Sequence, residues 1–357
     1  MRLRSLFLLV VINSCFLIKI NAQSNSPRYY NAYKLNDSLQ IDGDAKEKAW
    51  EQASWSSDFI DIQGELTPRY NTRFKMLWDV NHLYVYVRME EPHIWGTLKQ
   101  RDTVVFYNND FEMFIDPDGD THNYMEIEIN ALNTVWDLFL TKPYREEGRV
   151  LNHWDINGLK SAVSYQGTLN DPSDTDTSWS LEFAIPWKAL KEGGGPPPEN
   201  NFWRINFSRV QWQHDLVANR YMRRRDSLGN YLEESNWVWS PQGVINMHEP
   251  EHWGYVYFSP LEVSEQQNQQ FTIPEDEKIK WKMYKIYRAQ KAYYREHRKW
   301  ARDLKSLQLD PLLQERKLMQ PTMELHATGW NLSIRSPFSN DLLIIREDGY
   351  FKTITNR

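Results

Sequence analysis

Between about residues 27 and 260 the chain alternates short runs of aromatic and β-branched residues with clusters of turn-forming residues. Residues 74–78 (FKMLW) and 83–88 (LYVYVR) are two such runs, and the intervening DVNH is typical of a hairpin connection. The same pattern recurs at residues 111–115, 124–129, 135–140, 178–185, 203–210 and 254–258. Many short strands at this spacing, with few helical patterns between them, predict an antiparallel β-sandwich.

A different pattern begins after the polar run EQQNQQ at residues 265–270, which has the composition of a linker. Acidic residues at 275–277 open a segment that reaches about residue 307 with apolar residues at helical spacing and basic residues toward its end. The tail from 322 to 354 returns to strand-like alternation around Asp348-Gly349. These features predict a long helix followed by a small β element.

The N-terminus has the parts of a secretory signal peptide. Arg2 and Arg4 precede an apolar run at residues 6–18, and Ala22 offers a small residue for cleavage. We therefore expect residues 1–22 to be removed and the protein to cross the inner membrane to the periplasm or the outer surface. The alternative is a lipobox around Cys15, which would leave that residue as a lipidated N-terminus.

Removal of this segment limits the chemistry of the mature chain. Cys15 is the only cysteine, so the mature protein would lack thiol chemistry and thiolate metal sites. Loss of Arg2, Arg4 and Lys19 lowers the formal charge from −6 to −9, which argues against nucleic acid as a partner. No later apolar stretch has the length of a transmembrane helix. The 16 Trp and 19 Tyr are numerous enough both to fill a sandwich core and to provide a few platforms that stack on sugar rings.

Six ordered segments between Ile41 and Gly254 carry a family resemblance. They are IDGDA at 41–45 with AW at 49–50, the hairpin at 74–87, DFEMFID at 110–116, WSLEFAIPW at 179–187, RINF at 204–207, and WSP at 239–241 with WG at 253–254. Together they resemble the family 9 carbohydrate-binding modules, within the wider group that includes DOMON domains. The resemblance covers roughly 220 residues. It implies a jelly-roll-like β-sandwich and an oligo- or polysaccharide as ligand.

We therefore expect a mainly β protein, with an antiparallel jelly-roll-like β-sandwich, a long C-terminal helix and a small β appendage. The expected parts are a signal peptide (1–22), a family 9-like carbohydrate-binding sandwich (27–260), a linker (261–274), and a helix with a short β-hairpin (275–357). The expected function is that of a secreted carbohydrate-binding protein in glycan breakdown or capture rather than a self-sufficient enzyme. The C-terminal helix offers a surface for a protein partner.

The resemblance also implies where the sugar would lie. Family members hold a sugar between two aromatic side chains, and Phe106 and Tyr107 fill the stretch of the first. The second position falls on Met247 or His248, and a basic sugar-binding position falls on acidic Glu128. Because neither closing-loop residue is a tryptophan, nearby loop tryptophans are candidates to replace it. The candidate sugar-binding residues are Phe106, Tyr107, Glu112, Glu128, Trp136, Trp154 and Trp239.

A metal site is a further expectation. Asp116, Asp118 and Asp120 surround a tight turn, and hard carboxylate oxygens suit Ca²⁺. The segment lacks the long loop and terminal Glu of an EF-hand, and a solvated hairpin turn explains the same residues. Family members often hold structural calcium, so the resemblance favours Ca²⁺ as a structural cofactor.

Three other functions remain open from the residues alone. Glu126 and Glu128 project from one face of a predicted strand, which would suit a glycosidase acid/base pair. Met247 and His248 would be candidate axial ligands in a haem-binding DOMON-like domain, and a scaffold without sugar binding would have the same fold. The run from His248 to His252 fits H-E-x-x-H in letters, but Pro250 in its middle excludes the helix that the zinc-protease motif needs.

Overall fold

The computed structural model describes residues 26–193, 199–265, 271–309 and 321–356. The strands are β1 (Tyr29–Lys34), β2 (Ile60–Asp61), β3 (Thr72–Trp78), β4 (His82–Glu90), β5 (Asp110–Asp116), β6 (Tyr124–Asn130), β7 (Val135–Leu140), β8 (Val150–Leu151), β9 (Lys160–Gln166), β10 (Ser178–Pro186), β11 (Phe202–Gln211), β12 (His214–Val217), β13 (Arg220–Arg223), β14 (Ser235–Val238), β15 (Gly254–Glu262), β16 (Thr322–Leu325), β17 (Trp330–Arg335), β18 (Leu342–Arg346) and β19 (Phe351–Ile354). The helices are α1 (Lys48–Gln52) and α2 (Glu275–His297), with short 3-10 turns η1 (Val105–Tyr107), η2 (Tyr144–Glu146), η3 (Trp187–Gly193), η4 (Pro250–His252) and η5 (Val263–Glu265).

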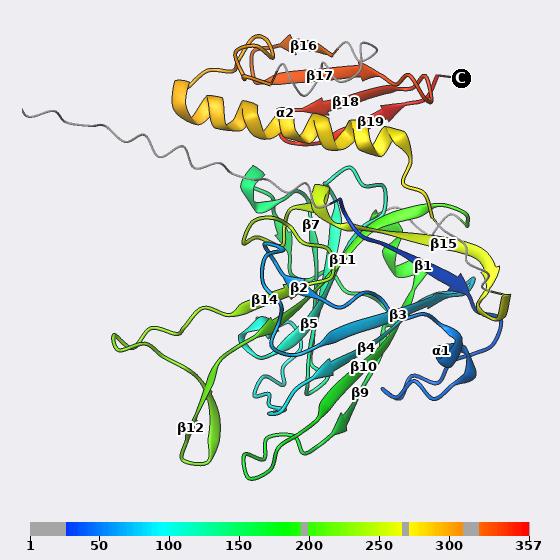
Figure 1. Ribbon diagram of the computed structural model, residues 1–357, viewed down its shortest axis with the longest axis vertical. Coiled ribbons are helices and arrows are strands. Elements are labelled where there is room, and N and C mark those ends of the chain that lie inside the picture. The colour runs from blue at the N-terminus through cyan, green and yellow to red at the C-terminus, as the bar shows by residue number, and fades with distance from the viewer. Residues whose placement is uncertain (1–25, 194–198, 266–270, 310–320, 357) are drawn as a thin grey trace, which may run out of the picture.

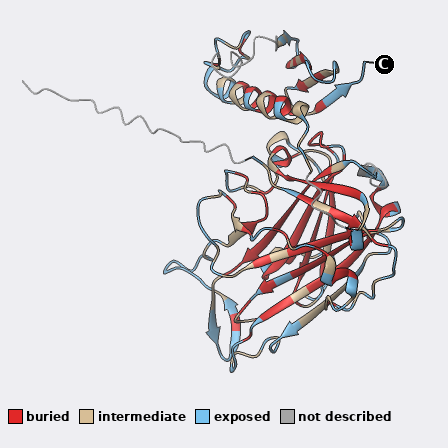
Figure 2. Cartoon of the chain, turned by 45° about the vertical axis from the view of Figure 1, so that its right-hand side comes forward, coloured by how far each residue is buried: buried red, intermediate tan, exposed pale blue. Residues whose placement is uncertain are grey.

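Most strands belong to one long sheet that bends over itself. Its order is β8-β7-β6-β5-β11-β15-β1-β3-β4-β10-β9, with β14 and β2 extending from β11. Phe74 of β3 lies 4.1 Å, between ring centroids, from Phe207 of β11, and Phe111 of β5 packs near Phe183 of β10. Side chains from the two halves of the sheet therefore meet in a shared core, which gives the two layers of a sandwich (Figures 1 and 2).

The prediction of a mainly β fold is confirmed, and eight of the strands lie where the sequence pattern placed them. The sheet is mixed rather than purely antiparallel, because β1 runs parallel to both β15 and β3. This first strand joins the two halves of the sheet. Its neighbours come from the two ends of the sandwich region in sequence, so no local pattern indicates the pairing.

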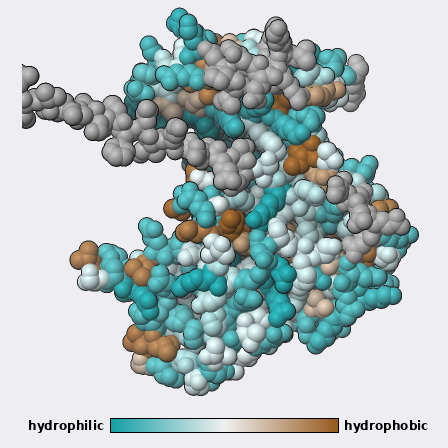
Figure 3. All heavy atoms as spheres, in the orientation of Figure 1, coloured by the Kyte–Doolittle hydropathy of each residue, from teal (hydrophilic) through white to brown (hydrophobic). Residues whose placement is uncertain are grey.

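The period-two pattern of the strands decides which side chains enter the core. On β5, Phe111, Met113 and Ile115 point into the space between the layers, where they are buried. Successive residues of a strand point to opposite faces, so the alternate acidic residues of β5 lie on the outer face of this layer. In the space-filling view the visible surface of the sandwich is mostly hydrophilic, with a few hydrophobic patches (Figure 3).

The C-terminal part packs α2 against a four-stranded antiparallel sheet of β16–β19 (Figure 1). Ile279, Met283 and Ile286 of α2 share a buried core with Trp330 and Leu332 of β17. The sequence predicted a short hairpin in this region, whereas the structure has the four strands β16–β19. The helix ends at His297 rather than near residue 307, because Arg298 adopts a left-handed conformation (φ 54°) that closes the last turn.

The expected signal peptide and Cys15 lie outside the described residues, as does most of the polar run at 265–270. In the part of the chain that the structure describes, no helix is both long and apolar enough to cross a membrane.

Candidate functional site

A cavity of about 370 Å³ lies over the outer face of β5, β6 and β7. Loop segments beside β14 and before η4 form its other walls. Its lining residues are Ile62, Phe106, Glu112, Phe114, Glu126, Glu128, Trp136, Leu138, Tyr144, Val210, Glu234, Asn236, Ile245, Asn246, Met247 and His248.

Strand register gathers the side chains of the cavity floor. Glu112 of β5 pairs with Glu128 of β6, and Phe114 of β5 pairs with Glu126. Glu128 also pairs with Trp136 of β7. Directly paired residues in neighbouring antiparallel strands project from the same face, so three carboxylates and two aromatic rings share one surface. The residues between them in sequence fill the sandwich core, and that alternation fixes which face carries the polar groups.

Aromatic rings stand around this floor on short turns. Phe106 lies on η1, and its amide donates to Glu128 Oε2 at 2.9 Å. Tyr144 lies on η2, and its ring meets the His248 ring edge-to-face with centroids 4.3 Å apart. The His248 ring also lies edge-to-face with Phe114 at 5.7 Å. Aromatic faces and an imidazole therefore form the rim above a carboxylate floor.

The electrostatics of the floor are unusual because its acids are buried together. Burial raises the pKa of Glu112 to about 7, and burial with the charges of neighbouring acids raises the pKa values of Asp110 and Glu128 well above the usual range. Glu126 is shifted in the same direction by burial and by Glu112. Among the described residues, no Lys or Arg forms an ion pair with these four side chains. The floor therefore lacks a protein cation to balance its charge.

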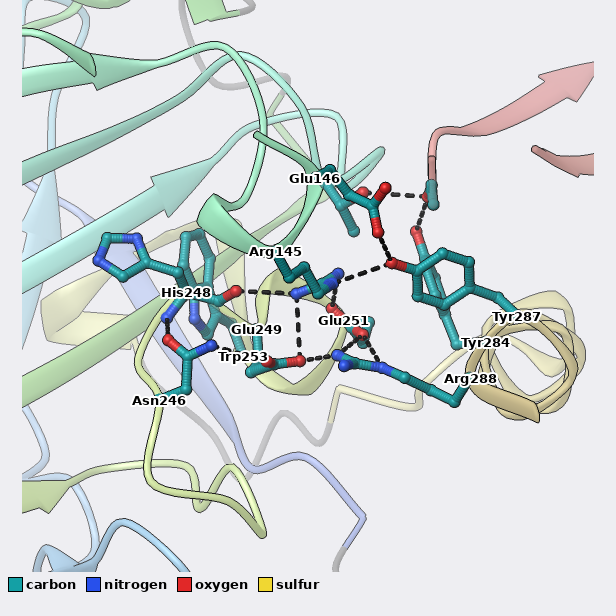
Figure 4. Close-up of polar contacts among 12 residues, drawn as sticks. Arg145, Glu146, Asn246, His248, Glu249, Glu251, Trp253, Tyr284, Tyr287 and Arg288 are labelled. Carbon is teal, nitrogen blue, oxygen red and sulfur yellow. Dashed lines mark hydrogen bonds and ion pairs between the residues drawn. The ribbon is translucent and has the colours of Figure 1, made fainter. Parts of the chain in front are cut away.

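The loop that supplies His248 is held by a network of ion pairs that reaches the C-terminal helix (Figure 4). Arg145 donates to the His248 carbonyl at 2.8 Å and forms ion pairs with Glu249 at 3.1 Å and Glu251 at 2.9 Å. From α2, Arg288 contacts both of these carboxylates, and its Nε lies 3.1 Å from Glu251 Oε1. The cavity wall is thus tied to the C-terminal part of the chain.

A family model described as "Carbohydrate family 9 binding domain-like" matches residues 41–256, which is more than half of the chain. The chain belongs to this family. The resemblance inferred from the six motifs is therefore confirmed. A comparison with curated proteins found no match.

The comparison with solved structures found a candidate carbohydrate-binding protein from Bacteroides uniformis ATCC 8492, at 15% identity and a TM-score of 0.49, covering 65% of this chain and 100% of that one. A family 9 carbohydrate-binding module from Caldicellulosiruptor kristjanssonii in complex with glucose has 16% identity and a TM-score of 0.42, covering 68% and 100%. The same kind of module from that organism in complex with cellotriose has 16% identity and a TM-score of 0.40, covering 69% and 98%.

Four of the sugar-binding residues predicted from the sequence line the cavity together. They are Phe106, Glu112, Glu128 and Trp136, and the closing-loop residues Met247 and His248 also reach it. Of these two residues, Met247 is apolar and buried, and His248 presents a polar imidazole to the cavity. Sequence reasoning missed Tyr144, Asn236 and Asn246. Tyr144 and Asn246 lie about 100 residues apart on irregular segments, where no strand pattern indicates direction.

Three other suggested residues lie outside the lining. Tyr107 is exposed and lies against Arg223 of β13, with the guanidinium 4.6 Å from its ring centroid. Trp154 packs on Phe139, which belongs to the opposite face of β7. Trp239 is buried in the sandwich core, edge-on to Phe74 at 5.2 Å. These placements give Trp154 and Trp239 packing roles.

The turn at Asp116, Asp118 and Asp120 brings one carboxylate oxygen of each residue within 4.8 Å of the others. Most of these oxygens already have partners, since Asp116 accepts from the amides of Gly119 at 3.0 Å and Thr121 at 2.9 Å. Asp120 accepts from the His122 amide at 2.7 Å, and Lys280 of α2 donates to the Gly119 carbonyl. This donor-rich setting favours a hydrogen-bonded turn that docks α2, and calcium at this turn stays a prediction.

The segment from His248 to His252, which matches H-E-x-x-H, does not have the helical geometry of a zinc protease. Pro250 begins the 3-10 turn η4, and β15 starts at Gly254, so the two histidines do not share a face of an α-helix. The pKa of His248 is lowered to about 3 by burial and by the nearby Arg145. Tyr124 hydroxyl lies 2.9 Å from its Nδ1. His248 is thus a neutral cavity residue.

Proposed function

We propose that this protein binds a saccharide in the cavity over β5–β7 and acts in glycan capture or breakdown as a binding protein. The observation that carries the proposal is the combination of an aromatic rim with a floor of three carboxyl groups, in a chain of the family 9 binding-domain type. Ring faces of Trp136 and Tyr144 suit the apolar faces of a pyranose. Carboxylates are strong acceptors for sugar hydroxyls, and a protonated carboxyl also donates.

The size of the cavity suits a short ligand segment. About 370 Å³ lies at the lower end of the range of small-molecule sites and accommodates one or two sugar rings. Asn236 and Asn246 add amide donors to a floor that otherwise holds acceptors. Without a bound cation, this floor favours a neutral or basic sugar over an acidic one, because no Lys or Arg is among the lining residues.

Binding is favoured over hydrolysis by the placement of the carboxyl groups. Glycosidases place two carboxyl groups on either side of the scissile bond. Glu126 and Glu128 instead project from the same face of one strand, β6, and both belong to the floor of the cavity. The two groups form one continuous surface rather than two walls of a cleft.

The test is a panel of plant, algal and host oligosaccharides, followed by calorimetry on each ligand found. Trp136→Ala should reduce affinity at least tenfold, whereas Trp154→Ala should not change it. The pair is matched, because both tryptophans are half-buried and lie on opposite faces of the same layer. Absence of binding across the panel, or equal losses in both variants, would refute the proposal.

Secretion is part of the same proposal and rests on the N-terminal pattern. Cleavage after Ala22 would release the protein to the periplasm or the outer surface. Mass spectrometry of the protein from the producing cell would show a mature N-terminus at Gln23. A lipid-modified N-terminus at Cys15 would instead support membrane anchoring.

A further inference from the structure

Asp110, Glu112 and Glu128 bring three carboxylates to one point beneath the cavity. Asp110 and Glu112 alternate on β5, and Glu128 is the register partner of Glu112 on β6. One oxygen from each of the three lies within 4.8 Å of the other two. Ca²⁺ binds oxygen at 2.3–2.6 Å, so oxygens across a calcium ion are separated by up to about 5 Å. The three oxygens are therefore close enough together to share one Ca²⁺ coordination sphere.

The second observation is the carboxylate of Asp110. Its side chain is fully buried, and neither oxygen has a hydrogen-bond partner within the described residues at normal length and geometry. Burial and the Glu112 and Glu126 charges raise its pKa well above the usual range, and the smaller opposing effect comes from the backbone amide of Val210. A buried carboxylate without a strong partner is costly and usually indicates a missing proton or ion.

Other buried carboxylates in this protein show how the fold normally satisfies such groups. Glu182 accepts from the Trp50 indole at 2.8 Å and from the amides of Asp42 and Gly43. Glu91 pairs with Arg209 at 3.0 Å. Within the described residues, Asp110 has no cation partner and no hydrogen bond of normal length and geometry, although it lies next to two further acids. The contrast points to a partner that the polypeptide itself does not supply.

We propose that Asp110, Glu112 and Glu128 form a divalent-cation site, suited to Ca²⁺, in the floor of the cavity. Asp110 lies behind the floor, whereas Glu112 and Glu128 also line the cavity. The ion therefore keeps an open side toward the cavity, where water completes its shell. If the proposed function holds, two neighbouring sugar hydroxyls replace that water, and the ion links the saccharide to the protein.

The test is calorimetric titration of the chelator-treated full chain with calcium chloride, without any sugar. We expect a calcium site that Asp110→Asn weakens at least tenfold, because the amide keeps the shape and removes the charge. Glu112→Gln should weaken it similarly and serves as a second variant if Asp110→Asn does not fold. Asp118→Asn is the matched control, an acid-to-amide change in the acidic turn at Asp116, Asp118 and Asp120.

Absence of calcium binding overturns the site. Binding that Asp118→Asn removes and Asp110→Asn leaves unchanged also overturns it, and assigns the ion to the turn at Asp116–Asp120. A second titration with saccharide, in calcium and in EDTA, separates this inference from the proposed function. Calcium binding without sugar binding supports the metal site and refutes the saccharide. Sugar binding of equal affinity in EDTA refutes the link between ion and sugar.

Discussion

Arg288 on the C-terminal helix pairs with Glu251, three residues after the cavity residue His248, with Nε 3.1 Å from Oε1. The helix therefore contributes to holding a loop that belongs to a different part of the fold. Arg145, which donates to the His248 carbonyl, pairs with the same glutamate from the sandwich side. Glu251 is buried and forms ion pairs with both arginines, Arg145 of the sandwich and Arg288 of α2.

Arg288→Ala should lower the free energy of unfolding by about 1–2 kcal/mol, since Glu251 keeps Arg145 but loses a second partner. Because the loop then moves more freely, saccharide affinity should fall about threefold to tenfold. Chemical denaturation and calorimetry measure the two effects. Arg295→Ala, an exposed position on the same helix, is the control. An affinity unchanged by Arg288→Ala would show that the loop does not need the helix.

Tyr144→Ala should weaken saccharide binding by roughly tenfold, about 1.4 kcal/mol, because the ring is a rim platform of the cavity. Tyr107→Ala is the control, since both tyrosines are about half exposed, at 49% and 46%, and only Tyr144 lines the cavity. Calorimetry compares them directly. A larger loss of affinity in Tyr107→Ala would place the sugar at Tyr107, the aromatic position predicted from the sequence.

His248 should make stability depend on pH. Its folded pKa of about 3 lies below the ordinary value of 6.5, so the unfolded chain binds a proton that the folded chain rejects. Its contribution to stability is therefore present above pH 6.5 and is lost as the pH falls toward 3. Arg145 disfavours the charged ring, whereas Glu126 lies 4.0 Å from Nε2, and Tyr124 and Tyr144 contact the ring.

His248→Gln removes this titration. The stability difference between the wild-type protein and the variant should shrink by up to about 1.4 kcal/mol per pH unit below pH 6.5. Thermal unfolding of both proteins from pH 7.5 to 4.5 measures this stability difference. Other acids that titrate in this range affect both proteins alike, so their contribution cancels in the difference. A difference that stays constant with pH would contradict the buried, neutral imidazole.

Trp239→Ala should destabilise the fold by about 3–5 kcal/mol, since the indole is buried between Phe74 and Phe207. Gly254 next to this indole cannot take a larger side chain without a shift of the ring, because a Cβ on Gly254 would lie 2.2 Å from it. Saccharide affinity at low temperature should not change in the folded variant. A selective loss of affinity with normal stability would make Trp239 a binding residue.

Local alternation determined much of this protein. The sequence DFEMFID predicts a strand, and its period of two separates Phe111 and Met113 from Glu112. The next strand follows after the connection at residues 117–123, so a short-range hairpin brings Glu128 beside Glu112. The family motifs then indicated the sandwich and the floor of its cavity. These features depend on residues that are close together in the sequence, so they can be predicted from the sequence alone.

Only the tertiary structure decided which aromatic residues face the cavity. Trp136, Trp154 and Trp239 are the same residue type in similar strand and turn contexts, yet they line the cavity, pack on the rear face and fill the core, respectively. Tyr144 reaches the rim because η2 folds over β6 and meets His248, which Arg145 and the distant Arg288 hold in place. Such contacts depend on how the long sheet closes on itself and where the C-terminal helix docks, and neither leaves a periodic pattern in the chain.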